Sequence, residues 1–409
     1  MRDVASVLRL AAAIAVAALL AGCATALPRQ TPPDAAVAEM AIVSDLPSAR
    51  FFGDEVPKDI ISEIRRKLPN LVTHAADTRT ASGRPIVEYL ALSGGGSDGA
   101  FGAGLLAGWT LHGTRPSFEV VTGISAGAII APFAFLGPAY DRQLAEIWTQ
   151  YETSELLTAQ ILPGLLGGSS LADTSKLGEL VARYVDRKFL RAIAAEYRRG
   201  RILLIGTTNL DMQRPIIWNM GEIAASNHPQ APELFHKVIM ASAAIPGAFP
   251  PVNIAVIADG KAYEEMHVDG GVTRGVFIAP TQLNLKTFDR FYPVPPVRRI
   301  YIIKNGKLTP EFEAVKPTAI TIAARSITTL TKSQSHGDLY RIWRTAVESG
   351  ADFNATAIPA DFNVKAKQAF DPEYQRALYQ VGFKMGRTGA HWAKLPPEVQ
   401  APSRALAAR

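Results

Sequence analysis

The sequence contains a single cysteine, Cys23, among its 409 residues. A disulfide within the chain is therefore impossible, and a metal site built from several thiolates is excluded as well. No pair among the seven histidines has the spacing of metal ligands, so we expect neither a metal ion nor another cofactor. The chain also lacks a repeat of fixed period and a dense run of lysine and arginine. These absences argue against a repeat architecture and against nucleic acid as a partner.

Positive charge is present but unevenly distributed. The formal net charge is +6, and residues 286–409 hold 19 lysines and arginines against 10 aspartates and glutamates. A basic C-terminal third is compatible with binding to an anionic lipid surface or to nucleic acid. Because no dense basic run occurs, the favoured interpretation is a solvated surface with scattered charges.

The N-terminal apolar stretch, LAAAIAVAALLAG, is too short to span a bilayer. Arg2 and Arg9 precede it, a pattern typical of a secretory signal peptide. The tetrapeptide that follows, LAGC, ends at Cys23 and resembles the lipobox of bacterial lipoproteins. This resemblance implies cleavage before Cys23, diacylglycerol on its sulfur and, because Ala24 is not an aspartate, sorting to the outer membrane. The alternative is a cysteine that happens to end a signal peptide.

The remaining chain has enough apolar residues, 48% hydrophobic overall, for one large domain or two smaller ones. Prolines after Cys23 indicate a tether, and apolar residues at helical spacing between 60 and 68 predict a helix. We divide the chain into a signal peptide (1–22), a tether with a helical segment (23–85), a catalytic domain (86–285) and a basic extension packed on that domain (286–409).

Strand and helix patterns alternate through the central region. Strands are predicted at 86–92, 118–122, 202–207, 216–220, 266–268 and 299–303, and helices at 100–111, 126–136, 141–151, 176–199 and 232–244. After Lys286, the further strand and a long helix ending near Gly350 complete the fold or append to it. This alternation predicts an α/β fold with a largely parallel central sheet flanked by helices. The apolar segment 156–170 is interpreted as a mobile cover over an apolar site or as a buried loop.

A glycine-rich turn, LSGGGSDGAF, follows the first strand of this domain. Gly94, Gly96 and Gly99 satisfy the G-x-G-x-x-G pattern, which can bind a phosphate or direct backbone N–H groups at a developing oxyanion. A dinucleotide site also needs an acidic residue at the end of the next strand. Glu119 lies 25 residues after Gly94 but begins its strand. The oxyanion is therefore the better interpretation.

Two further motifs support ester chemistry. Gly123, Ser125 and Gly127 match the G-x-S-x-G nucleophile elbow, between a strand pattern and a helix pattern. Small residues flank the serine because the turn is tight and a Cβ atom would clash. Asp269 ends a strand pattern immediately before two glycines, which places its carboxylate at the functional edge of the sheet. Taken alone, Asp-Gly-Gly would be only a turn.

Together with MASAAIPGAFPPV (240–252), these motifs resemble the patatin-like phospholipase family over residues 88–285. The resemblance implies a three-layer patatin-like sandwich in which Ser125 is the nucleophile and Asp269 its base, as a dyad. It also implies that the N–H groups of Gly94, Gly95, Gly96 and Ala126 form an oxyanion hole. The glycines that support the motifs are Gly99, Gly123, Gly127, Gly270 and Gly271. Many members of the family have Arg or Lys where this chain has Asp98, which leaves the preference for phospholipid open.

Two histidines offer an alternative Ser-His-Asp triad. His267 lies two residues before Asp269, and His336 follows the aspartate in chain order, as in α/β-hydrolases. A carboxylate is a weak base unless it is desolvated, so we also expect a partly dry site. The apolar residues expected around it are Phe101, Leu105, Phe133 and Phe249.

The sequence therefore predicts a serine acyl-ester hydrolase that acts on lipids, of phospholipase A or lysophospholipase type, in the bacterial cell envelope. A general carboxylesterase or acyltransferase is one alternative. The other is a non-catalytic, lipid-binding envelope lipoprotein.

Overall fold

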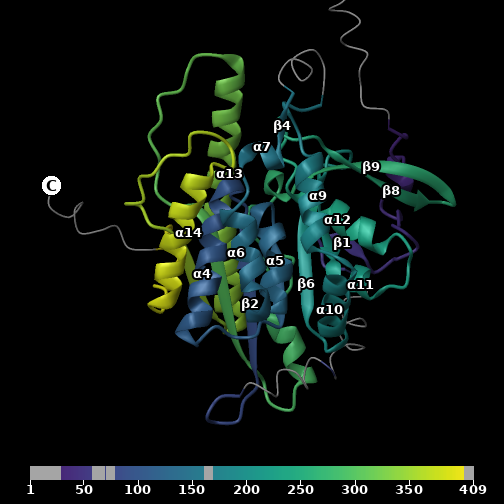
Figure 1. Ribbon diagram of the computed structural model, residues 1–409. Coiled ribbons are helices and arrows are strands. Elements are labelled where there is room, and N and C mark those ends of the chain that lie inside the picture. The colour runs from purple at the N-terminus through teal and green to yellow at the C-terminus, as the bar shows by residue number, and fades with distance from the viewer. Residues whose placement is uncertain (1–28, 58–69, 71–78, 161–168, 400–409) are drawn as a thin grey trace, which may run out of the picture.

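The computed structural model describes residues 29–57, 79–160 and 169–399, together with Asn70, and its centre is a nine-stranded sheet (Figure 1). The predicted signal peptide, Cys23 and the helix predicted over 60–68 lie outside these ranges. So does most of the apolar segment 156–170, of which 161–168 are not described.

The sheet is largely parallel. Its path runs β1-β7-β6-β3-β2-β10-β11, and β9 pairs with both β6 and β8. The five strands from β6 to β11 along this path are mutually parallel, whereas β1, β7, β8 and β9 make antiparallel pairs. The strands are β1 (Arg50–Phe52), β2 (Ile86–Leu92), β3 (Val120–Gly123), β6 (Ile202–Asn209), β7 (Arg214–Asn219), β8 (Val252–Ala258), β9 (Lys261–Asp269), β10 (Val297–Lys307) and β11 (Asp352–Ile358), with a separate pair of β4 (Thr158–Ala159) and β5 (Ala172–Asp173).

Helices cover both faces of the sheet. Along β2, Leu90 and Leu92 belong to one buried apolar cluster and Val87, Tyr89 and Ala91 to another, because successive strand residues face opposite sides. The α-helices are α2 (Ala35–Ala38), α4 (Gly99–His112), α5 (Ala126–Leu136), α6 (Asp141–Thr149), α7 (Thr153–Leu156), α9 (Ser175–Tyr184), α10 (Arg187–Arg198), α11 (Met220–Ala225), α12 (Ala231–Ser242), α13 (Ala319–Ser349) and α14 (Pro372–Arg387). Short 3-10 helices are η1 (Gly96–Asp98), η2 (Pro138–Tyr140), η3 (Gly270–Val272) and η4 (Leu285–Phe291). The predicted three-layer α/β fold is therefore confirmed.

Two predicted elements differ from the structure. The helix predicted over 176–199 is two helices, α9 and α10, because the chain leaves the helical conformation at Val185 and Asp186 and then restarts. The side chain of Asp186 accepts a hydrogen bond from the N–H of Phe189, 2.7 Å, and so caps α10. The strand predicted at 266–268 is the end of a longer strand, β9, which forms a hairpin with β8.

Residues after Lys286 complete the central sheet. β10 lies between β2 and β11, in register along seven residue pairs with β2. The long helix α13 then packs its buried residues Leu339, Ile342 and Ala346 against the same apolar cluster as Val87 and Tyr89. The carboxyl end of β10 is thereby brought beside the glycine-rich turn that follows β2.

The N-terminal segment packs along the edge of the sheet. β1 pairs antiparallel with β7, and the Arg29 guanidinium binds both carboxylate oxygens of Asp211 at 3.0 and 2.8 Å. Arg29 also donates to the carbonyl oxygen of Glu264 in β9. Within the described ranges, no helix combines the length and the apolar character that crossing a bilayer requires.

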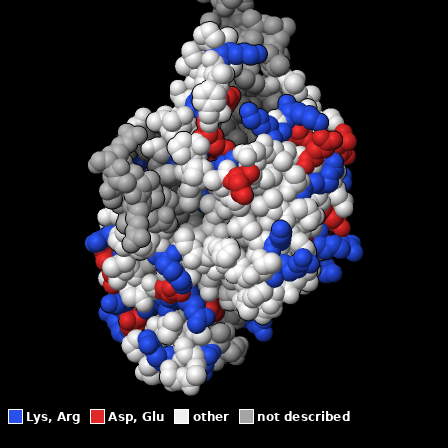
Figure 2. All heavy atoms as spheres, turned by 90° about the vertical axis from the view of Figure 1, so that its left-hand side faces the viewer, with Lys and Arg blue, Asp and Glu red and all other residues white. Residues whose placement is uncertain are grey.

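Acidic partners surround many cations of the C-terminal third. Figure 2 shows lysine and arginine side chains interspersed with aspartate and glutamate on the face that it presents, rather than gathered in one basic patch. Ion pairs in this part of the chain are Arg325–Glu313, Arg344–Glu348, Lys367–Glu373 and Lys394–Asp352. The arrangement agrees with the interpretation of a solvated surface with scattered charges.

Candidate active site

Ser125 lies at the sharp turn between β3 and α5. Its backbone has φ 55° and ψ −123°, in the left-handed half of the map that residues other than glycine seldom adopt. The serine N–H donates to Ser242 Oγ at 3.0 Å, and Ser242 Oγ in turn donates to the carbonyl oxygen of Gly206 at 2.6 Å. These bonds fix the strained turn to the neighbouring strand β6 and to the end of α12.

The glycines around Ser125 are required sterically. A Cβ atom on Gly123 would lie 2.3 Å from the carbonyl oxygen of Gly127, and one on Gly127 would lie 2.3 Å from that of Leu92. Real Cβ atoms do not approach backbone oxygens so closely, so both positions exclude larger residues. The steric interpretation of the G-x-S-x-G pattern is confirmed at these two positions.

Asp269 ends β9 and lies beside Ser125. Its Oδ1 accepts a hydrogen bond from the N–H of Gly271 at 2.7 Å, and its own N–H donates to the carbonyl oxygen of Ala244. Burial raises the pKa of Asp269 to about 6, although hydrogen bonds from the Ser125 side chain and the Gly271 N–H act in the opposite direction. The carboxylate is therefore ionised at neutral pH and is a stronger base than an exposed aspartate.

Both side chains line one cavity of about 300 Å³. Ser125 and Asp269 are each only 6% exposed. The glycine-rich turn forms one wall, the end of β10 another, and residues 327–335 of α13 a third. The predicted apolar neighbours of the site lie elsewhere. Phe101, Leu105, Phe133 and Phe249 are buried in the apolar core and do not line this cavity.

Gly94, Gly95 and Gly96 of the glycine-rich turn line the same cavity, but their backbone N–H groups differ in their partners. The N–H of Gly94 donates to the carbonyl oxygen of Gly275 at 3.1 Å, so the prediction that it is free for an oxyanion is wrong. Gly94 instead allows a close approach, since a Cβ atom there would lie 3.0 Å from Ser125 Cβ. Among the described residues, the N–H groups of Gly95, Gly96 and Ala126 donate to no protein acceptor.

Asn305, at the end of β10, holds the glycine-rich turn in place. Its Nδ2 donates to the carbonyl oxygen of Ser93 at 2.8 Å, its N–H donates to Ser93 Oγ, and its Oδ1 accepts from the N–H of Gly102. A Cβ atom on Gly95 would lie 2.1 Å from the Asn305 carbonyl oxygen. Sequence reasoning missed Asn305 because no local pattern links it to a turn more than 200 residues earlier.

The central part of the chain matches a known protein family. Residues 90–281 match the patatin-like phospholipase family model. The match falls within the stretch over which the sequence resembles that family, and it includes the turn, Ser125 and Asp269. It supports a lipid acyl hydrolase. No curated protein sequence matches the chain significantly.

Two solved structures are similar to this chain at low TM-scores. VipD from Legionella pneumophila has a TM-score of 0.38 and 12% identity, with 76% of this chain and 69% of VipD covered. Human GIVD cytosolic phospholipase A2 has a TM-score of 0.33 and 11% identity, with 68% of this chain and 54% of that protein covered. TM-scores this low assign neither a function nor a residue to this chain.

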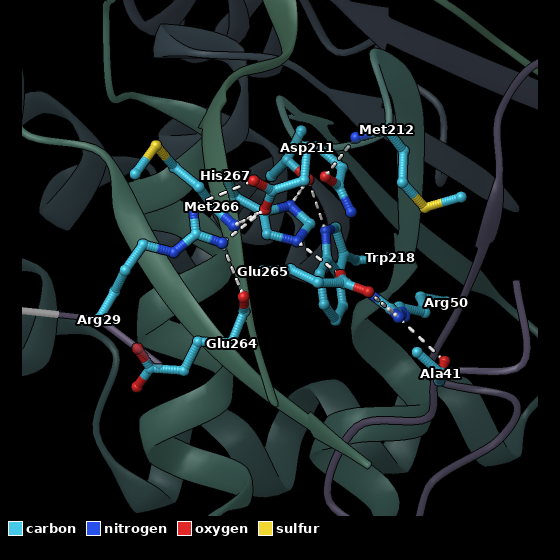
Figure 3. Close-up of polar contacts among 12 residues, drawn as sticks. Arg29, Ala41, Arg50, Asp211, Met212, Trp218, Glu264, Glu265, Met266 and His267 are labelled. Carbon is cyan, nitrogen blue, oxygen red and sulfur yellow. Dashed lines mark hydrogen bonds and ion pairs between the residues drawn. The ribbon is translucent and has the colours of Figure 1, made fainter. Parts of the chain in front are cut away.

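His267 lies in a buried polar network with Glu265, Arg50 and Trp218 (Figure 3). Its Nε2 lies 3.1 Å from Glu265 Oε2 and its Nδ1 lies 3.0 Å from Thr207 Oγ1. The Trp218 indole N–H donates to the same Thr207 oxygen, so this hydroxyl donates to Nδ1 and the imidazole proton is on Nε2. Arg50 binds Glu265 from the other side. Burial lowers the pKa of His267, which keeps the ring neutral.

His336 is also engaged elsewhere. It lies on α13 with its Nδ1 3.0 Å from Glu398 Oε1, and its side chain is 30% exposed. In the described parts of the chain, neither histidine bonds to Ser125 or Asp269. The geometry therefore offers Asp269 alone as the base beside the serine.

Proposed function

We propose that the protein is a serine hydrolase of lipid acyl esters, of phospholipase A or lysophospholipase type, which uses Ser125 and Asp269 as a dyad. One observation carries the proposal: a strained serine and a buried carboxylate of raised pKa share a cavity with Gly95 and Gly96, whose backbone N–H groups are uncommitted among the described residues. The match to the patatin-like phospholipase family supports the same class of substrate.

The acylation step follows from these groups. Asp269 accepts the proton of the Ser125 hydroxyl while Oγ bonds to the carbonyl carbon of the ester. The carbonyl oxygen becomes an oxyanion and accepts hydrogen bonds from Gly95, Gly96 and Ala126. As the tetrahedral intermediate collapses, the bond to the leaving alcohol breaks, and protonated Asp269 returns its proton to the alcohol oxygen.

Deacylation repeats the sequence with water. Asp269, again ionised, accepts a proton from a water molecule whose oxygen attacks the acyl carbon. The same N–H groups stabilise the second oxyanion. As this intermediate collapses, the Ser125–acyl bond breaks, protonated Asp269 returns its proton to Ser125 Oγ, and the fatty acid is released. The pKa of about 6 suits a group that must accept and return a proton near neutral pH.

A pair of serine variants tests the proposal. Ser125→Ala should abolish labelling by a fluorophosphonate probe and lower ester hydrolysis by about 10³-fold or more. Ser335→Ala is the matched control, because Ser335 lines the same cavity but donates its hydroxyl to the carbonyl oxygen of Thr331 in α13. Labelling and turnover of the control should remain near the wild-type values. A wild-type protein that neither hydrolyses esters nor reacts with the probe would instead favour a non-catalytic lipid-binding lipoprotein.

We also propose that the protein is anchored to the bacterial outer membrane by acylation of Cys23. The support is the resemblance of residues 20–23 to a lipobox and the basic, apolar segment before it. Several acyl chains on one protein give stable membrane attachment.

A further inference from the structure

A lysine that no motif singled out lines the cavity of Ser125. Lys304 lies near the end of β10, directly after Ile303, which pairs with Leu92 of β2. Ser93 and the glycine-rich turn follow Leu92, so the parallel pairing brings Lys304 to the same edge of the sheet as the proposed oxyanion site. Lys304 is 8% exposed and contributes to the cavity wall together with Ser125 and Asp269.

The ammonium group of Lys304 has no partner at bonding distance. In the described part of the structure, Nζ makes neither a hydrogen bond nor an ion pair. Nζ is not among the fully buried, unpaired side-chain atoms of the described residues, and Lys304 lines the cavity, so an anion in the cavity can reach it. Burial lowers the pKa of Lys304 to about 8, so the group is still largely protonated at pH 7.

The other charged groups of the cavity are already engaged. Lys332 and Lys307 both lie beside Glu311, at 3.0 and 3.9 Å. Asp98 accepts a hydrogen bond from the Tyr374 hydroxyl, and burial raises its pKa to about 6. Among the described residues that line the cavity, Lys304 is therefore the cation left for an external anion.

The carboxylates of Asp98 and Asp338 act to raise the pKa of Lys304, although neither forms an ion pair with its ammonium group in the described structure. Both carboxylates favour the protonated form of Lys304, and Lys332 opposes it. A Cβ atom on Gly306 would lie 3.5 Å from Lys304 Nζ and 3.9 Å from Asp98 Oδ2, so both groups border the same space. The absence of a side chain at Gly306 leaves room for a ligand atom between the lysine and the cavity.

We propose that Lys304 binds the phosphate of a phospholipid substrate while Ser125 attacks its ester, and that it thereby selects phospholipid over neutral lipid. The proposal rests on the hydrolase function proposed above. An ammonium group is a compact donor of three N–H bonds, which suits the oxygens of a phosphodiester. The reacting ester and the phosphate belong to one molecule, and the serine and the lysine line one cavity.

Substrate preference tests the assignment. Lys304→Met retains the length of the side chain and removes its charge. The rates would be measured on phosphatidylglycerol, on diacylglycerol with the same acyl chains in the same detergent micelles, and on a soluble nitrophenyl ester. We expect kcat/KM for phosphatidylglycerol to fall about 10- to 100-fold, the range for a lost hydrogen bond to a charged group. Most of the loss should be in KM, and the other two substrates should change less than about threefold.

Lys332→Met is the matched control. It removes a charge from the lining of the same cavity, but the Lys332 ammonium is already bound to Glu311 and to the carbonyl oxygen of Thr309. Its preference for phosphatidylglycerol over diacylglycerol should equal that of the wild type. Labelling of Ser125 by a fluorophosphonate in Lys304→Met shows that the variant has folded and that its elbow is intact.

Three results would overturn the assignment. Equal losses on all three substrates would mean that Lys304 supports the reaction or the fold, not the phosphate. An unchanged preference in Lys304→Met would exclude contact with the head group. Inhibition of nitrophenyl ester hydrolysis by inorganic phosphate in the wild type only, with lipid preference unchanged, would assign Lys304 to free phosphate. In all three cases the wild-type protein still hydrolyses esters. If the proposed hydrolase function were wrong, the wild-type protein would show no hydrolysis.

Discussion

Replacing Asp269 with asparagine should stabilise the fold and inactivate the protein. Asparagine has the same shape and can still accept the hydrogen bond from the Gly271 N–H, but it carries no charge and accepts no proton. The pKa of the carboxyl group rises from 3.8 to about 6 on folding, because burial disfavours the ionised form. A shift of about 2 units corresponds to about 3 kcal/mol. The ionised carboxylate lowers the free energy of unfolding by about this amount.

The pH dependence of this difference follows from the sign of the shift. Above pH 6 the carboxylate is ionised in both states, and the folded state bears the full unfavourable free energy. Below about pH 4 it is protonated in both, and the penalty disappears. The advantage of Asp269→Asn in the free energy of unfolding should therefore be about 3 kcal/mol at pH 7.5 and about 1 kcal/mol at pH 4.5.

Urea denaturation of both proteins at the two pH values measures the advantage. Ester hydrolysis by the variant should fall about 10³-fold or more. Ser125→Ala separates the two effects, since it abolishes hydrolysis with no stabilisation of that size. A stability difference that did not vary with pH would refute the argument that the buried carboxylate is ionised at a free-energy cost. Retained hydrolysis would refute its role as the base.

Four further outcomes are expected. Wild-type kcat/KM on a neutral soluble ester should rise about tenfold from pH 5 to pH 7 as Asp269, with its pKa of about 6, loses its proton; a flat profile would contradict this assignment. Asn305→Ala should lower kcat about 10- to 100-fold with little change in KM, because the turn loses its hydrogen bonds; steady-state kinetics would show whether KM changes instead. His267→Ala should reduce the free energy of unfolding by about 3 kcal/mol while kcat/KM stays within about tenfold of wild type, and inactivity of the folded variant would restore the triad. Cys23→Ser should move the protein from the membrane fraction to the soluble fraction, and a lipid label that persisted in the variant would exclude this cysteine as the acylated residue.

The sequence predicted best those helices and strands whose bounds are set by the pattern of their own residues. The residues of β2 are all buried and, apart from Glu88, apolar or aromatic, and α5 begins directly after Ser125, so both were predicted with their observed bounds. The β8–β9 hairpin was missed although its signal was present. Asp259 and Gly260 both have positive φ, as a two-residue hairpin turn requires, and Asp-Gly is a favoured pair for it.

The site was predictable only where its residues lie in compact motifs. Ser125 and Asp269 each lie within a short pattern that the backbone geometry demands. Ser242, Lys304 and Asn305 reach the same site through the pairing of strands and the end of a helix, and no local pattern marks them. Position 98 is an example. The sequence indicates that a cation is missing at Asp98, whereas the fold brings Lys304 from β10 to the same cavity.

The bidentate contact of Arg29 with Asp211 has a geometric consequence for an acylated protein. Arg29 is the sixth residue after Cys23, and six steps of a fully extended chain span about 20 Å at most. Arg29 is also held by Glu264, and Asp269 lies five residues further along the same strand, about 17 Å away. A lipid on Cys23 would therefore tether the protein to the membrane by a short segment that is attached near the strand carrying Asp269. The protein would search for substrate in two dimensions, among the lipids that surround its own anchor.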